Sequence, residues 1–299
     1  MNMEEKKEHP STYFVQDRSS EEELKRLQVQ DSMLTTKMGG VLAEQDDPER
    51  FKQVLDVGCG TGGWIIEATK KYPTMTHLIG VDVSKTMVDY ARSQAEAEGV
   101  ADRVEFHVMD ALRMLEFPRG YFDLINQRLG VSYLRTWDWP KLLSEYQRVG
   151  KQGAVIRITE SDVAHGNNAS FTQLSDLVLQ TLHSSGHLKA PEMNATIDML
   201  APLLHQHGIK NVQTRKYDIT YPIGAPEGQA FYEDMQHFFR TLVPFLRKWS
   251  CLPDNYDEIY QKAFTEMKQP DFVGAWTLIT AWGTNGGLEQ LPPPLLESH

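Results

Sequence analysis

Three glycines at alternate positions directly follow a short apolar stretch, and no other feature constrains the fold of this chain as strongly. The stretch is residues 53–57, the glycines are Gly58, Gly60 and Gly62, and a helix is expected at residues 63–71. Glycine adopts left-handed backbone angles and leaves no side chain between a loop and its ligand. This pattern predicts a ligand-binding loop at the open edge of a sheet, although such glycines can also serve only as a turn.

From residue 53 onward, stretches of strand length alternate with stretches of helix length. Such alternation predicts an α/β fold in which a mostly parallel sheet carries helices on both faces. Ser84 is expected to cap one helix, Gly99 to end it, and Pro140 to lie in the first turn of another. The seven expected strands are residues 53–57, 77–83, 104–109, 121–127, 153–160, 212–220 and 272–282.

The remaining segments are expected to add helices around this sheet. Ser19 and Ser20 precede three glutamates, which predicts the start of a helix. Aromatic residues recur at helical spacing over residues 231–249, where Pro244 is expected to kink the helix. This aromatic stripe either forms core or lines an acceptor pocket. We assign residues 1–48 to an N-terminal arm, 49–160, 195–222 and 270–285 to the core, 161–194 and 223–269 to a helical lid, and 286–299 to a tail.

Carboxylates stand at the ends of three successive predicted strands. Asp56 precedes the glycines, Asp82 ends the second strand, and Asp110 follows the third between Met109 and Ala111. Each acid alone could be a helix cap, but all three are expected at one edge of a parallel sheet. Asp56 suits an ammonium group and would repel the pyrophosphate of a dinucleotide. Asp82 can accept hydrogen bonds from ribose hydroxyls, and Asp110 from an adenine amine.

These motifs resemble those of the class I S-adenosylmethionine-dependent methyltransferases, of the small-molecule or secondary-metabolism type. The family's glycine motif corresponds to residues 55–62, its second-strand acid to Asp82, and its adenine-contacting acid to Asp110. Its fourth strand corresponds to residues 121–127. The resemblance implies S-adenosyl-L-methionine as cofactor and a Rossmann-like, seven-stranded sheet with helical lid insertions and an N-terminal helical arm.

The resemblance covers about residues 50–220 and, more loosely, the last strand. Residues 148–153 depart from the family's usual Leu-Lys-Pro-Gly-Gly turn. Arg128 and residues 137–143 are similar to a subgroup of small-molecule enzymes and to fungal regulators of the same build. In that subgroup an N-terminal aromatic residue covers the cofactor, which implies this role for Tyr13, or else an exposed position in an arm. The expected cofactor contacts are Tyr13, Asp56, Gly58, Cys59, Gly60, Gly62, Asp82, Val83, Met87, Met109, Asp110, Ala111, Asn126 and Gln127.

Methyl transfer to a small acceptor requires little chemistry from the protein. The reaction is an in-line displacement at a sulfonium carbon, so the protein mainly aligns the nucleophile and excludes water. No catalytic residue follows from the sequence, and His237 and Arg128 are only candidates, as are other histidines that could equally be structural. The acceptor is expected to be apolar or aromatic, and its expected contacts are Arg128, Tyr133, Phe231, His237 and Phe238.

The composition of the chain disfavours several kinds of binding partner. The chain has 30 basic and 41 acidic residues, a net charge of −11, which disfavours binding to nucleic acid or to an anionic membrane surface. Its two cysteines, Cys59 and Cys251, argue against a disulfide framework, and no metal site is expected. The sequence contains no apolar run of membrane-spanning length and no secretory signal, so a cytoplasmic protein is expected.

Several alternatives stay open at this point. The chain could instead methylate a macromolecule, or bind S-adenosylmethionine as a regulator without catalysing transfer. A nicotinamide dehydrogenase is disfavoured by the charge of Asp56 in the glycine loop. Neither the acceptor atom nor the oligomeric state follows from the residues, and a homodimer remains one alternative.

Overall fold

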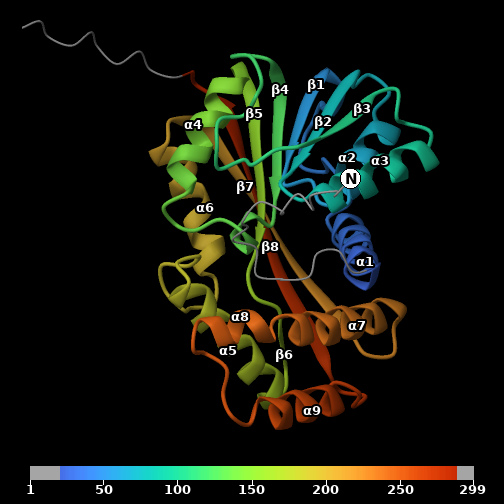
Figure 1. The fold of residues 1–299 in the computed structure, drawn as a ribbon, viewed down its shortest axis with the longest axis vertical. Coiled ribbons are helices and arrows are strands. Elements are labelled where there is room, and N and C mark those ends of the chain that lie inside the picture. The colour runs from blue at the N-terminus through green and yellow to red at the C-terminus, as the bar shows by residue number, and fades with distance from the viewer. Residues whose placement is uncertain (1–20, 288–299) are drawn as a thin grey trace, which may run out of the picture.

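The computed structural model describes residues 21–287, and a single eight-stranded sheet lies at its centre (Figure 1). The strand order is β3-β2-β1-β4-β5-β8-β6, and β7 pairs with β8 as well. The pairings that link β3, β2, β1, β4 and β5 are all parallel, whereas β8 runs antiparallel to its three neighbours. The strands are β1 Gln53–Val57, β2 His77–Asp82, β3 Val104–Val108, β4 Phe122–Arg128, β5 Gly150–Ser161, β6 His165–Gly166, β7 Ile209–Pro222 and β8 Val273–Asn285.

The expected α/β fold is confirmed, but the prediction of seven strands was wrong by one. The additional strand is β6, whose two residues pair with Gly274 and Ala275 at the beginning of β8. Because β5 pairs with β8 only as far as Leu278, the first residues of β8 remain available for another partner. Two residues are too few to show the alternation of apolar and polar side chains by which strands are recognised in a sequence.

Helices cover both faces of the sheet because the buried side chains of its strands alternate. Val54 and Leu124 pack in one apolar cluster with helices α2 and α3, whereas Leu55 and Ile125 pack in a second cluster with α4 and α6. Successive side chains of a strand point to opposite faces, so one continuous apolar strand supports two cores. These four helices are α2 Gly63–Lys71, α3 Lys85–Ala97, α4 Trp139–Val149 and α6 Ala195–Gln206.

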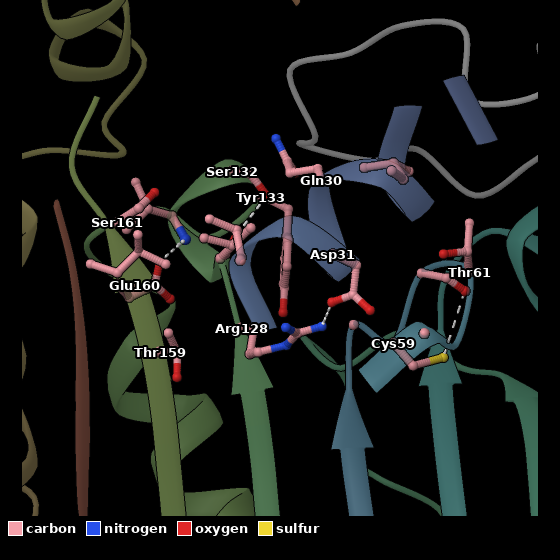
Figure 2. A pocket seen from close by; sticks show the side chains of 18 of the residues that line it. Gln30, Asp31, Cys59, Thr61, Arg128, Ser132, Tyr133, Thr159, Glu160 and Ser161 are labelled. Carbon is pink, nitrogen blue, oxygen red and sulfur yellow. Dashed lines mark hydrogen bonds and ion pairs between the residues drawn. The ribbon is translucent and has the colours of Figure 1, made fainter. Parts of the chain in front are cut away.

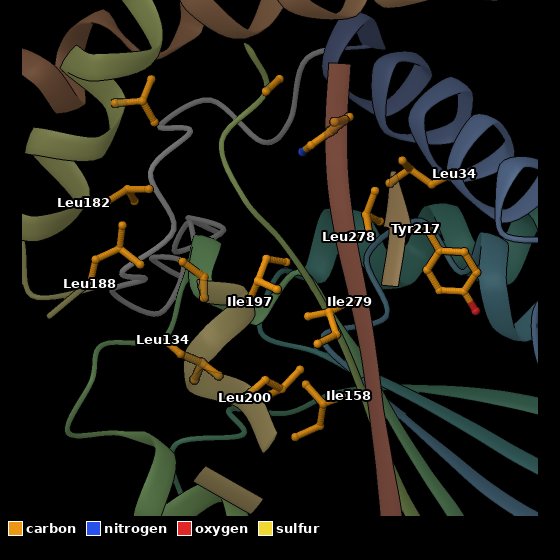
Figure 3. Packing of buried hydrophobic residues seen from close by; sticks show 14 of the residues in the cluster. Leu34, Leu134, Ile158, Leu182, Leu188, Ile197, Leu200, Tyr217, Leu278 and Ile279 are labelled. Atoms are coloured by element: carbon orange, nitrogen blue, oxygen red, sulfur yellow. The ribbon is translucent and has the colours of Figure 1, made fainter. Parts of the chain in front are cut away.

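The other helices gather beyond one end of the sheet, where α1 lies beside α7 (Figure 1). The apolar cluster on the α6 face continues into them, and Figure 3 shows side chains of β5, α5, α6 and β8 around it. The aromatic stretch, expected to be one helix kinked at Pro244, divides instead into α7 and α8 at Leu242, and Pro244 lies in the first turn of α8. These helices are α1 Glu21–Lys37, α5 Ala169–Ser184, α7 Pro226–Thr241, α8 Val243–Lys248 and α9 Tyr256–Glu266. Between residues 21 and 287, no helix combines the length and apolar character that crossing a membrane requires.

A buried hydrogen-bonded chain links the segment before β1 to the carboxyl end of that strand. Arg157 on β5 donates to Glu44 at 2.6 Å, and both side chains are only 1% exposed. Arg157 also donates to the amide oxygen of Asn126 at 2.7 Å, and Asn126 donates to Asp56 at 2.7 Å. Burial raises the pKa of Glu44, but the charge of Arg157 and the hydrogen bonds from Arg157, Gln45 and the backbone together hold that pKa below its usual value. The positive charge of Arg157 in the core of the sheet thus holds Asp56 in place through Asn126.

Removing the cation from this chain is expected to destabilise the fold. An Arg157→Met variant leaves Glu44 buried without a countercharge, and we expect it to lose about 3–5 kcal/mol of unfolding free energy. The double variant Arg157→Met/Glu44→Leu removes both charges and should be more stable than the single one. Urea unfolding followed by circular dichroism measures both losses. A double variant less stable than Arg157→Met would contradict this account.

Candidate active site

A cavity of about 310 Å³ lies where the carboxyl ends of the parallel strands meet the added helices. Strands β1, β2, β4 and β5 contribute the residues at or next to their ends, and helices α1, α5 and α7 contribute the opposite walls. Figure 2 shows this junction, with Arg128 at the end of β4 directed toward Asp31 on α1. The site therefore has one wall from the sheet and another from helices distant in sequence.

The glycine loop has the backbone conformation that its sequence predicts. Gly58, Gly60 and Gly62 have positive φ angles of 67°, 52° and 79°, which side chains rarely adopt. At Gly58 the space is also closed, because an added Cβ would lie 2.5 Å from the hydroxyl oxygen of Tyr133. Cys59 fastens the loop to β2 by donating its backbone N–H to the carbonyl of Val81 at 3.0 Å. The glycines at 58 and 60 line the cavity with bare backbone.

Asp82 and Asp110 are held by backbone donors at the edge of this cavity. The carboxylate of Asp82 accepts from the N–H of Gly60 at 3.0 Å and from that of Ser84 at 2.8 Å. Asp110 accepts from the N–H of Leu112 at 2.9 Å. A carboxylate offers about four lone-pair positions, so both groups keep capacity for a ligand. Four further residues with apolar side chains line the cavity around them: Val83, Met87, Met109 and Ala111.

Asp56 lies at the same edge but is more deeply buried. Its side chain accepts from Asn126 at 2.7 Å and lines the cavity, although the residue is only 3% exposed. Burial raises the pKa of Asp56 to about 7, even though the charge of Arg128 lowers it. A carboxyl of this kind gains from a positively charged ligand, which compensates for the water it has lost.

Ion pairs attach α1 to the sheet and to α7. Arg128 donates to Asp31 on α1, and more weakly to the hydroxyl of Thr35 at 3.3 Å. Arg26 of the same helix binds Asp234 on α7 at 2.8 Å, and both side chains are buried. Each pair joins segments far apart in the sequence, so the position of α1 over the cavity depends on the assembled fold.

Two further carboxyls reach the cavity from the end of β5. Glu160 accepts from the N–H groups of Gly130 and Val131 at 2.8 and 3.1 Å. Asp162 follows two residues later and is 4% exposed. Burial raises the pKa of Glu160 to about 8 and that of Asp162 to about 6, against nearby backbone N–H groups that lower both. The sheet edge therefore carries five carboxyls rather than the three expected. The two additional ones, Glu160 and Asp162, lie on the side of β5.

Most residues singled out in the sequence meet at this cavity. Thirteen of the predicted contacts line it: Asp56, Gly58, Cys59, Gly60, Asp82, Val83, Met87, Met109, Asp110, Ala111, Arg128, Tyr133 and, from α7, Phe238. The remaining ones lie elsewhere. Gly62 begins the next helix, and Phe231 is fully buried and stacks on Tyr221. Tyr13 lies outside the described residues.

Three predicted residues support the site from behind rather than line the cavity. Asn126 and Gln127 are fully buried, and they bond to Asp56 at 2.7 Å and to Glu160 at 3.3 Å. His237 lies with its Nε2 atom 3.2 Å from a carboxylate oxygen of Glu23. Each of them touches a charged group of the site or of the helices that cover it.

Several residues that line the cavity were not predicted from the sequence. Glu160 and Asp162 carried the same signal as the first three acids, namely a carboxylate at the end of a predicted strand. Asp31 has no such signal, because it lies within a helix and reaches the cavity only through tertiary packing. Leu129 lines the cavity with a left-handed φ of 55°, a strained conformation for a branched side chain and one that sequence patterns do not reveal.

The geometry of the cavity indicates the class of protein. A glycine loop with left-handed angles, carboxylates at successive strand ends and a cavity at the carboxyl edge are features of a Rossmann-like nucleoside-binding domain. Six acidic residues line the cavity against two basic ones, Arg26 and Arg128, so the site suits a cationic ligand. Within residues 21–287, no group of three or more His, Cys, Asp or Glu residues is arranged to hold a metal ion.

Comparison with known proteins finds similarity to methyltransferases. Residues 54–153 match the model of a methyltransferase domain. The chain is 33% identical over 162 residues to ajmaline N-methyltransferase from Rauvolfia serpentina, covering 53% of this chain and 54% of that protein. It is 29% identical over 150 residues to a probable chloroplastic tocopherol O-methyltransferase from Oryza sativa subsp. japonica, covering 50% and 40%. This part of the chain is therefore similar to a methyltransferase domain, and both of these relatives are named as methyltransferases.

The likeness is partial in extent. The chain spans about half the length of the curated relatives it matches. Among solved structures, the YcgJ protein from Bacillus subtilis superimposes with a TM-score of 0.50 and 20% sequence identity, over 80% of this chain and 93% of that one. At that identity the superposition supports the fold alone.

The buried carboxyls predict a characteristic dependence of stability on pH. Because Asp56 and Glu160 have folded pKa values of about 7 and about 8, above their ordinary values, the unfolded chain loses these protons first as pH rises. Their contribution to the free energy of unfolding should therefore fall between about pH 4 and about pH 8. Urea unfolding at four pH values should show a smaller fall for Glu160→Gln than for the unsubstituted protein.

The control for this prediction is Glu258→Gln, which removes an exposed carboxylate on α9. Its stability should change with pH as that of the unsubstituted protein does. If Glu160→Gln also followed that curve in parallel, the assignment of a raised pKa to Glu160 would fail.

Proposed function

We propose that this protein transfers the methyl group of S-adenosylmethionine to a small acceptor with an apolar or aromatic body. The observation that carries this proposal is the convergence of Asp56, Asp82 and Asp110 on one cavity beside the bare backbone of Gly58 and Gly60. The two relatives named above are enzymes for an N-methylation and an O-methylation of small molecules, which favours an acceptor of that kind.

The residues at the cavity fit the proposed cofactor. Asp82 has its carboxylate oriented by two backbone donors and can accept from ribose hydroxyls. Asp110, flanked by Met109 and Ala111, suits an adenine ring and its amine. Asp56 suits the ammonium group of the methionine portion, because a buried carboxyl gains from a nearby cation. We assign the binding of the cofactor to these residues.

The far side of the cavity is suited to an apolar acceptor. Its walls include side chains from α5, α7 and β8, several of them aromatic. Apolar and aromatic walls with a few polar groups are typical of sites for small organic molecules. The walls comprise Val178, Leu182, Met235, Phe238, Phe239, Trp276 and Leu278.

The proposed mechanism relies on alignment and on the exclusion of water. When bound, S-adenosylmethionine supplies a methyl group on a sulfonium leaving group. The chain's own residues hold the acceptor behind that carbon, and α1 closes the cavity through the Arg128–Asp31 and Arg26–Asp234 ion pairs. Bringing two reactants into a fixed geometry can supply about 7–11 kcal/mol of the barrier. His237 then acts on the position of α1 through Glu23 rather than as a base.

Asp82 provides the test of the cofactor assignment. We expect S-adenosylmethionine to bind with micromolar affinity and Asp82→Ala to weaken binding by at least about tenfold, because charge-assisted hydrogen bonds are lost. Isothermal titration calorimetry measures both affinities. Asp102→Ala, which removes an exposed carboxylate before β3, is the control and should bind normally. Equal affinities of the two variants would refute the role of Asp82.

Turnover is the test of the activity itself. We expect the protein to release S-adenosylhomocysteine when S-adenosylmethionine is mixed with one of a series of small aromatic acceptors bearing amine, phenol or activated carbon nucleophiles. Chromatography with mass detection measures the product and the gain of one methyl group. A protein that binds the cofactor but stays silent with every acceptor would favour a regulator instead.

A further inference from the structure

The charges of the cavity are not all accounted for by the proposed cofactor. Of the six acidic residues that line it, Asp56, Asp82 and Asp110 face the groups of a sulfonium nucleoside in the proposal above. Asp31 is neutralised by its ion pair with Arg128. Glu160 and Asp162 remain. The charge of Lys216 and the backbone N–H groups of Asn194 and Thr196 act on Asp162, but neither the cofactor nor a lining arginine pairs with these two carboxyls.

Asp162 carries a buried oxygen without a partner. The residue is 4% exposed, and its Oδ2 atom forms no hydrogen bond although it is shielded from water. Its backbone is fixed, because its carbonyl accepts from the indole N–H of Trp276 at 2.8 Å. A buried carboxylate oxygen without a donor is unfavourable, and such groups call for a missing partner. Since Asp162 lines the cavity, a ligand can supply that partner.

Glu160 lies two residues before Asp162, at the end of β5. Both residues line the same cavity. Figure 2 shows Glu160 at the end of β5, next to the loop that follows β4. Two backbone N–H groups, of Gly130 and Val131, orient its carboxyl, one on each oxygen. The cavity is thus lined by the fixed carboxyl of Glu160 and by the carboxyl of Asp162, which has an unsatisfied oxygen.

The surroundings limit what can pair with these carboxyls. The neighbouring walls are apolar, with Val178 and Leu182 from α5 and Phe239 from α7. The two arginines that line the cavity are engaged elsewhere, Arg128 with Asp31 and Arg26 with Glu23 and Asp234. A ligand suited to this part of the cavity has an apolar body and a group that donates hydrogen bonds or carries positive charge.

We propose that the methyl acceptor is an amine with an apolar, aromatic body, and that Asp162, with Glu160 beside it, binds the nitrogen that is methylated. This inference rests on the methyltransferase function proposed above and specifies its substrate class. An amine provides the N–H donor that the Oδ2 atom of Asp162 lacks, and a positive charge that suits both carboxyls. An ether or a hydrocarbon of the same shape provides neither.

The carboxyls also suit the proton balance of N-methylation. A bound ammonium ion has no free electron pair, so it would first pass an N–H proton to one of the carboxylates. The free pair would then form the new N–C bond as the S–C bond breaks and leaves its pair on sulfur, and the positive charge would move from sulfur to nitrogen. Burial raises the pKa of Glu160 to about 8, which brings it closer to that of an amine and makes this carboxylate a better proton acceptor than an ordinary one.

The test compares amines with ethers of the same shape. Probes are tetrahydroisoquinoline with isochroman, and N-methylbenzylamine with benzyl methyl ether, titrated calorimetrically into the full chain saturated with S-adenosylhomocysteine. In the unsubstituted protein each amine should bind at least about tenfold more tightly than its ether, as expected for a charge-assisted hydrogen bond. Asp162→Asn should reduce that ratio to about one and leave the affinity for S-adenosylhomocysteine unchanged.

Two further variants keep the test decisive. Asp176→Asn removes an exposed carboxylate on α5, alters the net charge equally and should keep the preference for amines. If Asp162→Asn does not fold, Glu160→Gln should also weaken amine binding relative to the ether. Protein that binds S-adenosylhomocysteine but takes amines no better than ethers, or takes neither, overturns this inference alone. Protein that does not bind S-adenosylhomocysteine overturns the proposed function as well.

Discussion

The buried chain from Glu44 through Arg157 and Asn126 to Asp56 is the interaction on which the site depends. It places a full positive charge in the core of the sheet and uses it to hold the amide that bonds to Asp56. A buried cation is tolerated only where carboxylate and amide oxygens surround it. These hydrogen bonds therefore couple the stability of the central strands to the electrostatics of the cavity, so a substitution that changes one also changes the other.

A second constraint is the acidity of the cavity. Parallel strands end at one edge, so acids that follow different strands accumulate there, and six acidic residues face two arginines. Like charges at close range raise each other's cost of ionisation, and burial adds to it. The arrangement becomes favourable when cations enter. This physical requirement unites the proposed cofactor, which bears a sulfonium and an ammonium group, with the proposed amine acceptor.

Much of this arrangement could be predicted because its signals are local. The strand before Gly58, the positive φ angles of the loop and the acids at 56, 82 and 110 each depend on a few neighbouring residues. Strand β6 could not be predicted, because its two residues pair only where β8 extends beyond β5. Asn126 and Gln127 were expected to meet the cofactor, yet they lie behind the cavity wall and bond to its acids. Strand position indicates which edge a residue reaches, but not whether its side chain faces the cavity or the core.

The sequence by itself determined the fold class, the glycine loop and the three carboxylates of the proposed cofactor site, since periodicity and strand ends are properties of short segments. Only the tertiary structure decided how α1 is held over the cavity, because its contact between Asp31 and Arg128 joins residues 97 positions apart. It also decided that Glu160 and Asp162 are buried with raised pKa values. Burial and charge pairing arise from all the segments that surround a group, and no local pattern contains them.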